Sequence, residues 1–249
     1  MTDSSGRRRL CVIGFGCGPE QLTAEAAAAL RSVDYVVAAD KGADDQLLAV
    51  RREICAAHDV DLVAVPDPER DRSEHNATSY DGAVRDWHAA RVAAYARVVD
   101  ERPGDVGFLV WGDPAFYDST LRIVDRLAAE RDLAVDVVPG VSALQLLAAR
   151  HRVVLHDVGR PLLVTTGRRL LADATDHDNL AVFLDGSLTC RRLSGAWQVW
   201  WGANLGTPSE RLVAGPLAEA LPGIAAAREE ARGHAGWVMD TYLLRRAAC

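Results

Sequence analysis

Five short turns combine glycine with polar side chains, and each follows an apolar run of the kind that forms a β-strand. They occupy residues 14–19, 111–117, 138–143, 165–169 and 204–207. Glycine lets the backbone approach a bound molecule closely. Ligands of open α/β sheets collect outside the carboxyl ends of the strands. Together the turns indicate one ligand-binding cleft, although each turn alone also fits a purely structural role.

The first turn reads Gly-Phe-Gly-Cys-Gly-Pro and stands between an expected strand and an expected helix. A dinucleotide fingerprint has its third glycine where this chain has Pro19, and its glycine spacing is different. A nicotinamide or flavin cofactor is therefore disfavoured.

Asp113 and Ser142 are the polar side chains of these turns that are best placed for binding. Asp113, in a Gly-Asp-Pro turn, can accept hydrogen bonds from hydroxyl or ammonium groups. Ser142 opens a helix whose first N–H groups point outward. The structural alternatives are an ordinary turn aspartate and a helix cap.

The order of expected elements predicts an α/β protein with two lobes. In the first half, strands at residues 10–14, 35–39, 61–65, 106–111 and 135–138 alternate with helices at 23–31, 45–58, 81–101 and 119–131. This alternation is typical of a parallel sheet. In the second half, strands at 162–166, 180–184, 197–201, 211–213 and 236–242, with fewer long helices, favour a mixed sheet. A break at 112–119 divides the lobes into residues 1–114 and 115–249.

Composition excludes several classes of function. The 249 residues include 35 acidic and 28 basic side chains, for a net charge of −7, so duplex nucleic acid is disfavoured as a partner. No apolar run is long enough to span a membrane. The five cysteines are scattered without a C-x-x-C pair, which indicates reduced thiols in a cytoplasmic protein and no metal site.

In this order and at these spacings, the turns resemble the tetrapyrrole methylase family, the class III S-adenosylmethionine methyltransferases. The marks are the N-terminal glycine turn ending in Leu22-Thr23, residues 112–114, residues 139–143 and residues 206–207, and they span nearly the whole chain. The resemblance implies a parallel N-terminal lobe on the substrate side and a mixed C-terminal lobe, with S-adenosylmethionine as methyl donor in an interlobe cleft. It also implies a tetrapyrrole substrate and a homodimer.

Longer stretches, among them residues 111–123, 165–170, 201–207 and 236–246, resemble one branch of that family. This branch acts in cobalamin synthesis, methylates ring carbon C1 and releases an acetyl group as acetate. One departure is Pro19 directly after Gly18, where the family turn usually reads G-x-G-x-G-D-P. The loop is one residue shorter and lacks that carboxylate, unless Glu20 replaces it.

The resemblance places donor contacts on turn residues of both lobes. They are Cys17, Trp111, Gly112, Asp113, Phe116, Ser142, Ala143, Leu184, Asp185, Gly206 and Thr207. Small residues and backbone groups suit this task, because the protein mainly has to orient the methyl group and exclude water.

The implied reaction and substrate call for two further groups of residues. Water that attacks the acetyl carbonyl needs a general base and an oxyanion partner, for which the catalytic candidates are Asp40, Tyr80 and His88. Guanidinium groups bind the carboxylate arms of a tetrapyrrole in forked pairs. The substrate-binding candidates are Lys41, Arg51, Arg52, Arg70, Arg72, Arg91 and Arg168. Each of these has an ordinary surface or helix-face role as its alternative.

Two other functions remain open. The chain could be a family methylase that acts at a different ring position, an alternative that the missing loop carboxylate keeps open. It could instead be a non-catalytic tetrapyrrole carrier, which would keep the arginines without binding the donor. A nicotinamide enzyme ranks third because of Pro19.

Overall fold

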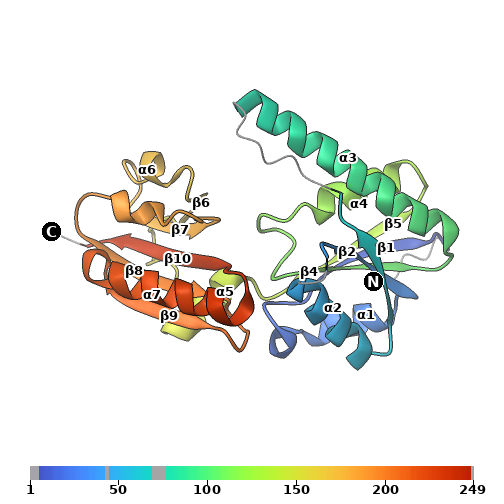
Figure 1. Ribbon diagram of the computed structural model, residues 1–249, viewed down its shortest axis with the longest axis horizontal. Helices are drawn as coiled ribbons and strands as arrows, with labels where there is room; N and C mark the ends of the chain where they lie inside the picture. Colours follow the sequence, from blue (N-terminus) through green and yellow to red (C-terminus); the bar gives the residue numbers. More distant parts are fainter. Residues whose placement is uncertain (1–5, 43–44, 69–76, 248–249) are drawn as a thin grey trace. The chain divides into compact units, whose positions relative to one another are not determined.

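A computed structural model describes residues 6–42, 45–68 and 77–247, with the side chains of residues 77–85 excepted. It divides into two compact units, Met1–Val141 and Ser142–Cys249 (Figure 1). Each unit has its own five-stranded sheet. The expected combination of a parallel sheet and a mixed sheet is confirmed.

The first unit is built on a parallel sheet with the strand order β3-β2-β4-β1-β5. Its strands are β1 (Arg9–Gly14), β2 (Tyr35–Asp40), β3 (Asp61–Pro66), β4 (Val106–Val110) and β5 (Ala134–Val138). Its helices are α1 (Ala24–Arg31), α2 (Gln46–Ala57), α3 (Ala77–Glu101), α4 (Thr120–Ala129) and the short 3-10 helix η1 (Pro19–Gln21).

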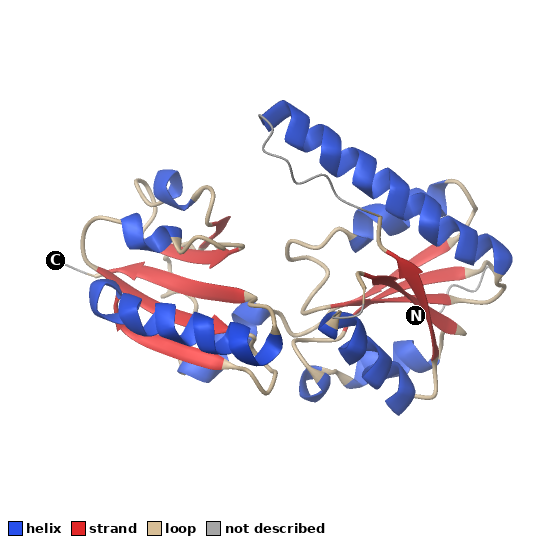
Figure 2. Ribbon diagram, in the orientation of Figure 1, coloured by secondary structure: helices blue, strands red, loops and turns tan. Residues whose placement is uncertain are grey.

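Helices cover both faces of this sheet (Figure 2), and strand β1 explains why they must. Leu10 and Val12 are buried against residues of α3 and α4. Cys11 and Ile13 point to the other face and are buried against α1 and α2. A parallel strand that is apolar on both faces has to be covered on both faces.

The neighbouring strands β1 and β4 form the switch point of the sheet. Helix α1, which follows β1, contributes to the core on one face, whereas α4, which follows β4, contributes to the core on the other. The two chain segments therefore diverge where these strands end. In doubly wound folds, ligands usually lie at the carboxyl edge of the sheet beside such a point of divergence.

The second unit has a mixed sheet with the strand order β6-β7-β10-β8-β9, in which only β6 and β7 pair in parallel. Its strands are β6 (Leu163–Thr166), β7 (Asn179–Phe183), β8 (Trp197–Ala203), β9 (Arg211–Pro216) and β10 (Asp240–Arg246). Its helices are α5 (Ala143–His151), α6 (Leu170–Asp173), α7 (Leu217–Ala235) and the 3-10 helix η2 (Thr189–Arg192).

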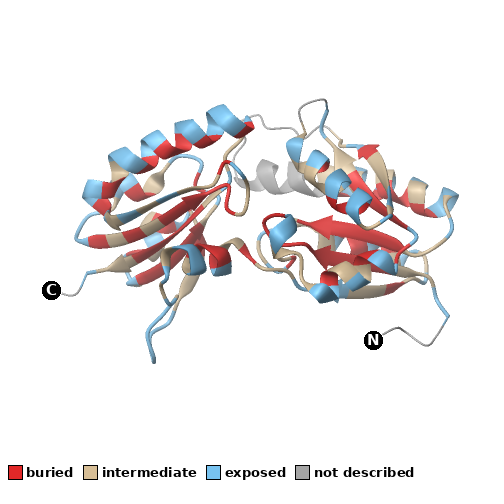
Figure 3. Ribbon diagram, turned by 90° about the horizontal axis from the view of Figure 1, so that it is seen from below, coloured by how far each residue is buried: buried red, intermediate tan, exposed pale blue. Residues whose placement is uncertain are grey.

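Strand β8 separates the two faces of the second sheet. Its odd-numbered residues, such as Val199 and Trp201, lie in the core beneath α7. On the other face Gly202 has no side chain, and a Cβ there would lie 2.9 Å from Leu147 of α5. Figure 3 shows the buried residues of this unit along the strands and on the inner side of α7.

Three sequence expectations differ from the structure. The boundary between the units lies after Val141 instead of near residue 114, because β5 pairs with β1 through Ile13 and Val138. Helix α7 was not expected, because Pro222 and Gly223 inside it are typical of a turn. The last strand begins at Asp240 instead of residue 236, because Gly236 adopts the left-handed conformation (φ 72°) that ends α7.

Candidate active site

Loops of the first unit meet where β1 and β4 end. The Gly112 N–H donates to the Gly16 carbonyl (2.8 Å), and the Gly16 N–H donates back to the Gly112 carbonyl (3.2 Å). The loop after β5 joins them, because Gly140 packs directly against Gly14, at the end of β1, and against Gly112. Three of the five glycine turns of the sequence therefore include residues of one tertiary cluster.

Glycine is required in this cluster because backbone lies where a side chain would be. A Cβ on Gly140 would lie 2.1 Å from the Gly112 carbonyl oxygen, and one on Gly14 would lie 2.6 Å from the Gly140 nitrogen. Gly16 and Gly112 also have left-handed backbone, with φ of 80° and 69°. Only glycine satisfies such close approaches without displacing a loop.

Asp113 ties two of these loops together. One carboxylate oxygen accepts the Ala115 N–H (2.8 Å), and the other accepts the Gly140 N–H (2.9 Å). Asp113 therefore has the role of an ordinary turn aspartate, which was the structural alternative for this residue. Any ligand contact of Asp113 has to use the remaining lone pairs of a carboxylate that already has two partners.

The other proposed donor contacts of the first unit have buried or half-buried side chains. Cys17 is 1% exposed, and its Sγ lies 3.8 Å from the Val141 carbonyl oxygen. Trp111 is half-buried and meets the Phe15 ring edge to face, with ring centroids 5.4 Å apart. Phe116 is half-buried, and its N–H donates to the Asp113 carbonyl (3.1 Å). The side chain of Cys17 faces the protein, so a ligand there would meet backbone.

Arg51 is a partly buried cation at the carboxyl end of β4. Its Nε donates to the Leu109 carbonyl and its Nη1 to the Leu47 carbonyl, both at 3.0 Å. Its guanidinium lies 5.8 Å from the centre of the Phe15 ring. Burial lowers the pKa of Arg51 from its ordinary value. Within the part of the chain that the structure describes, no carboxylate forms an ion pair with it.

Arg91 is in the opposite situation, because its charge is already matched. Nε and Nη2 make a forked pair with the two carboxylate oxygens of Asp67 (2.9 and 2.7 Å). Its guanidinium also covers the Trp87 ring at 4.1 Å. Substrate could use Arg91 only by sharing or displacing Asp67.

The remaining substrate candidates are dispersed. Lys41, Arg52 and Arg168 are exposed, and Arg52 lies on α2 directly after Arg51. Arg70 and Arg72 lie outside the described residues.

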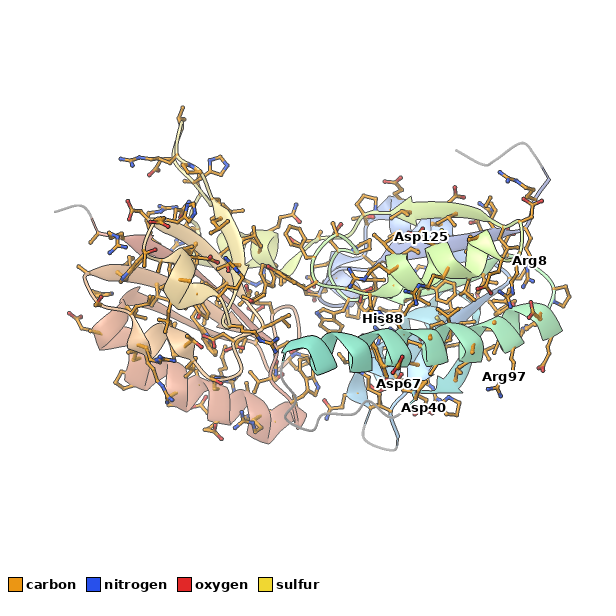
Figure 4. All side chains as sticks on the ribbon, turned by 90° about the horizontal axis from the view of Figure 1, so that it is seen from above. Arg8, Asp40, Asp67, His88, Arg97 and Asp125 are labelled. Carbon is orange, nitrogen blue, oxygen red and sulfur yellow. The ribbon has the colours of Figure 1, made fainter. Side chains whose placement is uncertain are left out.

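The catalytic candidates lie in different local settings. Asp40 ends β2, and its carboxylate accepts the Gly42 N–H (2.9 Å). Figure 4 shows Asp40 beside Asp67, whose N–H donates to the Asp40 carbonyl (2.8 Å). His88 is 9% exposed on α3 and neighbours the Trp87 ring. The side chain of Tyr80 is outside the described part. A base role for any of them stays a prediction.

In the second unit, Ser142 forms the N-terminal cap of α5. Its hydroxyl accepts the Gln145 N–H (3.3 Å), and the Gln145 side chain accepts the Ser142 N–H (2.8 Å). This reciprocal capping box realises the structural alternative for Ser142. Ala143 is half-exposed at the first helical position.

Leu184 and Asp185 follow β7 and contrast sharply in burial. The Leu184 side chain is 68% exposed and its backbone is left-handed (φ 53°), whereas Asp185 is 2% exposed. A left-handed leucine costs about 1 kcal/mol, and its exposure forgoes hydrophobic burial as well. A strained backbone conformation together with an exposed apolar side chain is typical of functional loops.

Gly206 and Thr207 belong to a turn anchored by Asn204. The amide oxygen of buried Asn204 accepts the Met239 N–H (2.8 Å), so the turn is attached to the start of β10. Thr207 Oγ1 donates to the Asn204 carbonyl (2.7 Å), and the Gly206 N–H donates to Glu210 (2.7 Å). Both proposed contacts therefore have structural partners.

Tyr117 is a residue that the sequence reasoning missed. Its ring is 47% exposed and its backbone is left-handed (φ 52°). Among the described residues, only Tyr117 and Leu184 combine a left-handed backbone with an exposed large apolar side chain. The available signal was an aromatic residue inside a glycine- and aspartate-rich turn after a strand.

The described residues contain neither a cluster suited to a metal ion nor a helix suited to cross a membrane. No group of three or more His, Cys, Asp or Glu side chains there is arranged to hold a metal ion. No helix in the same part has the length and apolar character needed to cross a membrane.

Comparison with known proteins places the chain among relatives over nearly its full length. The model of the family Tetrapyrrole (Corrin/Porphyrin) Methylases matches residues 9–221. A precorrin-6A synthase [deacetylating] from Sinorhizobium sp. is 42% identical over 98% of this chain and 97% of its own length.

Solved structures agree with this relationship. A cobalamin synthesis related protein from Corynebacterium diphtheriae is 38% identical, with a TM-score of 0.83 over 98% of this chain and 100% of that one. A uroporphyrin-III C-methyltransferase from Thermus thermophilus, complexed with S-adenyl homocysteine, is 21% identical, with a TM-score of 0.58 over 95% of this chain and 97% of that one. The latter likeness concerns the fold.

The close approach of the glycines gives a direct test of the loop cluster. Gly140→Ala should lower the free energy of unfolding by about 3 kcal/mol, because its Cβ would collide with the Gly112 carbonyl rather than with a movable side chain. Urea unfolding measures the loss. Gly233→Ala in α7 is the control, because its added Cβ would meet nothing within 4 Å apart from the backbone of its own helix, and alanine favours a helix by about 1 kcal/mol. Equal stability of the two variants would contradict the close packing of Gly140 against the Gly112 carbonyl.

Proposed function

This chain belongs to the tetrapyrrole methylase family, and on that premise we propose that it is the S-adenosylmethionine-dependent methyltransferase that makes precorrin-6A in cobalamin biosynthesis. The substrate is precorrin-5, the methyl group goes to C1 of the ring, and acetate is released. The observation that carries the proposal is 42% identity to a deacetylating precorrin-6A synthase over 98% of this chain and 97% of that one.

The same observation argues against the alternatives. A methylase for another ring position would not be expected to keep this identity over 98% of the chain. A carrier would not need the closely packed glycine loops of the first unit, nor a left-handed leucine such as Leu184 after a strand.

The overall reaction balances with one water. Water adds to the carbonyl carbon of the acetyl group, and the bond from that carbon to the ring breaks. Acetate leaves, and the electron pair kept by the macrocycle forms the new bond from C1 to the methyl carbon. The bond from that carbon to the sulfonium of the donor breaks, and S-adenosylhomocysteine leaves. A nearby base that accepts the proton of the water would accelerate the first step. Asp40, Tyr80 and His88 remain the proposed sources of that base.

The residues proposed to hold the donor fit its chemistry. S-adenosylmethionine carries an adenine ring, a ribose, an amino-acid end and an electrophilic methyl group on a sulfonium. Leu184 offers an exposed apolar side chain. Ala143 stands at the first position of α5, where the backbone N–H has no partner within the helix. Gly112 already donates its N–H to the Gly16 carbonyl, so it suits the donor by permitting close approach of the backbone. Asp185 is the exception, because it is buried with its carboxylate oxygens occupied.

Among the substrate candidates, Arg51 is best suited to a carboxylate arm of the macrocycle. Its Nε and Nη1 donate to neutral carbonyls, so its positive charge is not matched by a carboxylate among the described residues. A ligand carboxylate would restore charge balance to a partly buried cation. The exposed ring of Tyr117 follows the same strand, β4, and supplies a flat surface of the kind that stacks on conjugated rings.

We further propose a cytoplasmic homodimer. The scattered cysteines support the compartment, since Cys11, Cys17, Cys55 and Cys190 are buried and form no disulfide. Light scattering coupled to size exclusion measures the assembly, and a monomeric mass would contradict it.

The activity itself is tested with precorrin-5 and a donor labelled in its methyl group. We expect C1-labelled product together with one equivalent of acetate. Label at another ring carbon, or methylation without acetate, would indicate a sister methylase. Calorimetry with S-adenosylhomocysteine tests the carrier alternative, because a carrier would give no heat of binding.

Arg51→Lys tests the carboxylate contact. Losing the planar fork should raise KM for precorrin-5 by about tenfold, because a hydrogen bond to a charged group is lost, and leave donor affinity unchanged. Arg97→Lys is the matched control, because Arg97 is an exposed arginine of the first unit, on α3, that is not among the substrate candidates, and it should give wild-type kinetics. An equal change of KM in both variants would contradict the assignment. Thermal unfolding of both separates binding from stability.

A further inference from the structure

We propose that Tyr242 is a positioning residue for the methyl donor, which acts through Asp185 to hold the backbone of Leu184 in its left-handed conformation. The inference rests on the proposed function in one respect only, that the loop after β7 contacts the donor. It assigns Asp185 to the support of that loop rather than to direct contact.

Asp185 has little capacity left for a ligand. It accepts the Thr189 N–H (2.6 Å) and the Tyr242 hydroxyl (2.5 Å) on one oxygen, and the Thr189 hydroxyl (2.8 Å) on the other. The residue is 2% exposed and Tyr242 is 1% exposed. A buried carboxylate with three donors is stable where it is, and moving it toward a ligand would leave donors unpaired.

The backbone before Leu184 is held as well. The Gly167 N–H donates to the Phe183 carbonyl (3.1 Å) from the turn after β6. A Cβ on Gly167 would lie 2.4 Å from a carboxylate oxygen of Asp185, so this turn also closes one side of the carboxylate. Leu184 therefore stands between two fixed neighbours, Phe183 and Asp185.

These two anchors explain why Leu184 keeps a conformation that leucine disfavours. Its side chain is exposed, so its own packing does not supply the stabilisation. The left-handed turn must be imposed by the hydrogen bonds on either side of it. Of those, the bond from Tyr242 reaches from strand β10, 57 positions away, and ties the loop to the middle of the sheet.

The surroundings keep Tyr242 a permanent donor. Burial raises the pKa of Tyr242 far above its ordinary value, and burial raises the pKa of the neighbouring Cys190 thiol to about 11. Both groups stay protonated at neutral pH, so the Tyr242 proton remains directed at Asp185. The network works as a fixed support rather than as a titrating one.

Tyr242→Phe tests the inference, because it removes one donor to Asp185 and keeps the ring. Its Kd for S-adenosylhomocysteine, measured by calorimetry, should rise about tenfold, with KM for precorrin-5 unchanged. Tyr35→Phe is the matched control. Tyr35 is also fully buried, and its hydroxyl accepts from Arg8 (2.7 Å) and donates to the Arg102 carbonyl (2.9 Å) in the first unit. It should lose similar thermal stability with wild-type Kd.

A double variant separates positioning from general loss of structure. Asparagine accepts the left-handed region readily, so in a Leu184→Asn background the loop needs less support. Tyr242→Phe should then raise Kd by less than about twofold. The same tenfold rise in both backgrounds would overturn the proposal. Should Tyr242→Phe not fold, Thr189→Val removes another donor to Asp185 and carries the same expectation for Kd.

The result for the wild type keeps the two claims distinguishable. If the wild-type protein does not bind S-adenosylhomocysteine, the proposed function fails and this inference fails with it. If the wild type binds and the Tyr242 and Tyr35 variants bind equally well, only the positioning role is overturned. Weaker binding confined to the Tyr242 variant, and relieved by Leu184→Asn, supports it.

Discussion

The close backbone packing of Gly14, Gly112 and Gly140 is the constraint on which the first unit depends. Parallel strands bring all their carboxyl ends to one edge, and the chain must leave β1 and β4 toward opposite faces. Before they diverge, the segments after β1 and β4 pair through Gly16 and Gly112, and Gly140 packs against Gly14 and Gly112 with no room for a Cβ. Glycine removes the obstruction, and Asp113 replaces the lost packing with two hydrogen bonds. This edge of the first unit is therefore held by contacts between backbone groups.

The second unit solves a similar problem with side chains. Its sheet is mixed, and only β6 and β7 bring parallel carboxyl ends together. Asp185 supports the loop after β7 from the core side. In each unit, a carboxylate that the sequence motifs assign to a ligand accepts hydrogen bonds from the protein instead: Asp113 in the first unit and Asp185 in the second. Precise binding loops need such support, because small displacements greatly reduce rates.

Local sequence patterns predicted most of the strands and helices, but not the features that depend on contacts between residues distant in the sequence. The strands β1 to β4 begin or end within about one residue of expectation, because apolar runs between turns are local signals. The boundary between the units was wrong, because the pairing of Ile13 with Val138 is invisible to a local pattern. Helix α7 was missed, because packing of Leu217, Ile224 and Ala231 against the sheet outweighs the Pro222-Gly223 turn signal.

The candidate site shows the same limit more sharply in its arginines. Sequence could say that an acidic chain binding a polycarboxylate needs local positive charge, but Arg51 and Arg91 are equivalent in that argument. Tertiary contacts distinguish them: Asp67 neutralises Arg91, whereas carbonyls orient Arg51 without neutralising it. Partial burial of an unmatched cation is unfavourable in the free protein, as the lowered pKa of Arg51 reflects. An incoming carboxylate relieves that cost at Arg51 and would have to compete with Asp67 at Arg91, so binding should select the first.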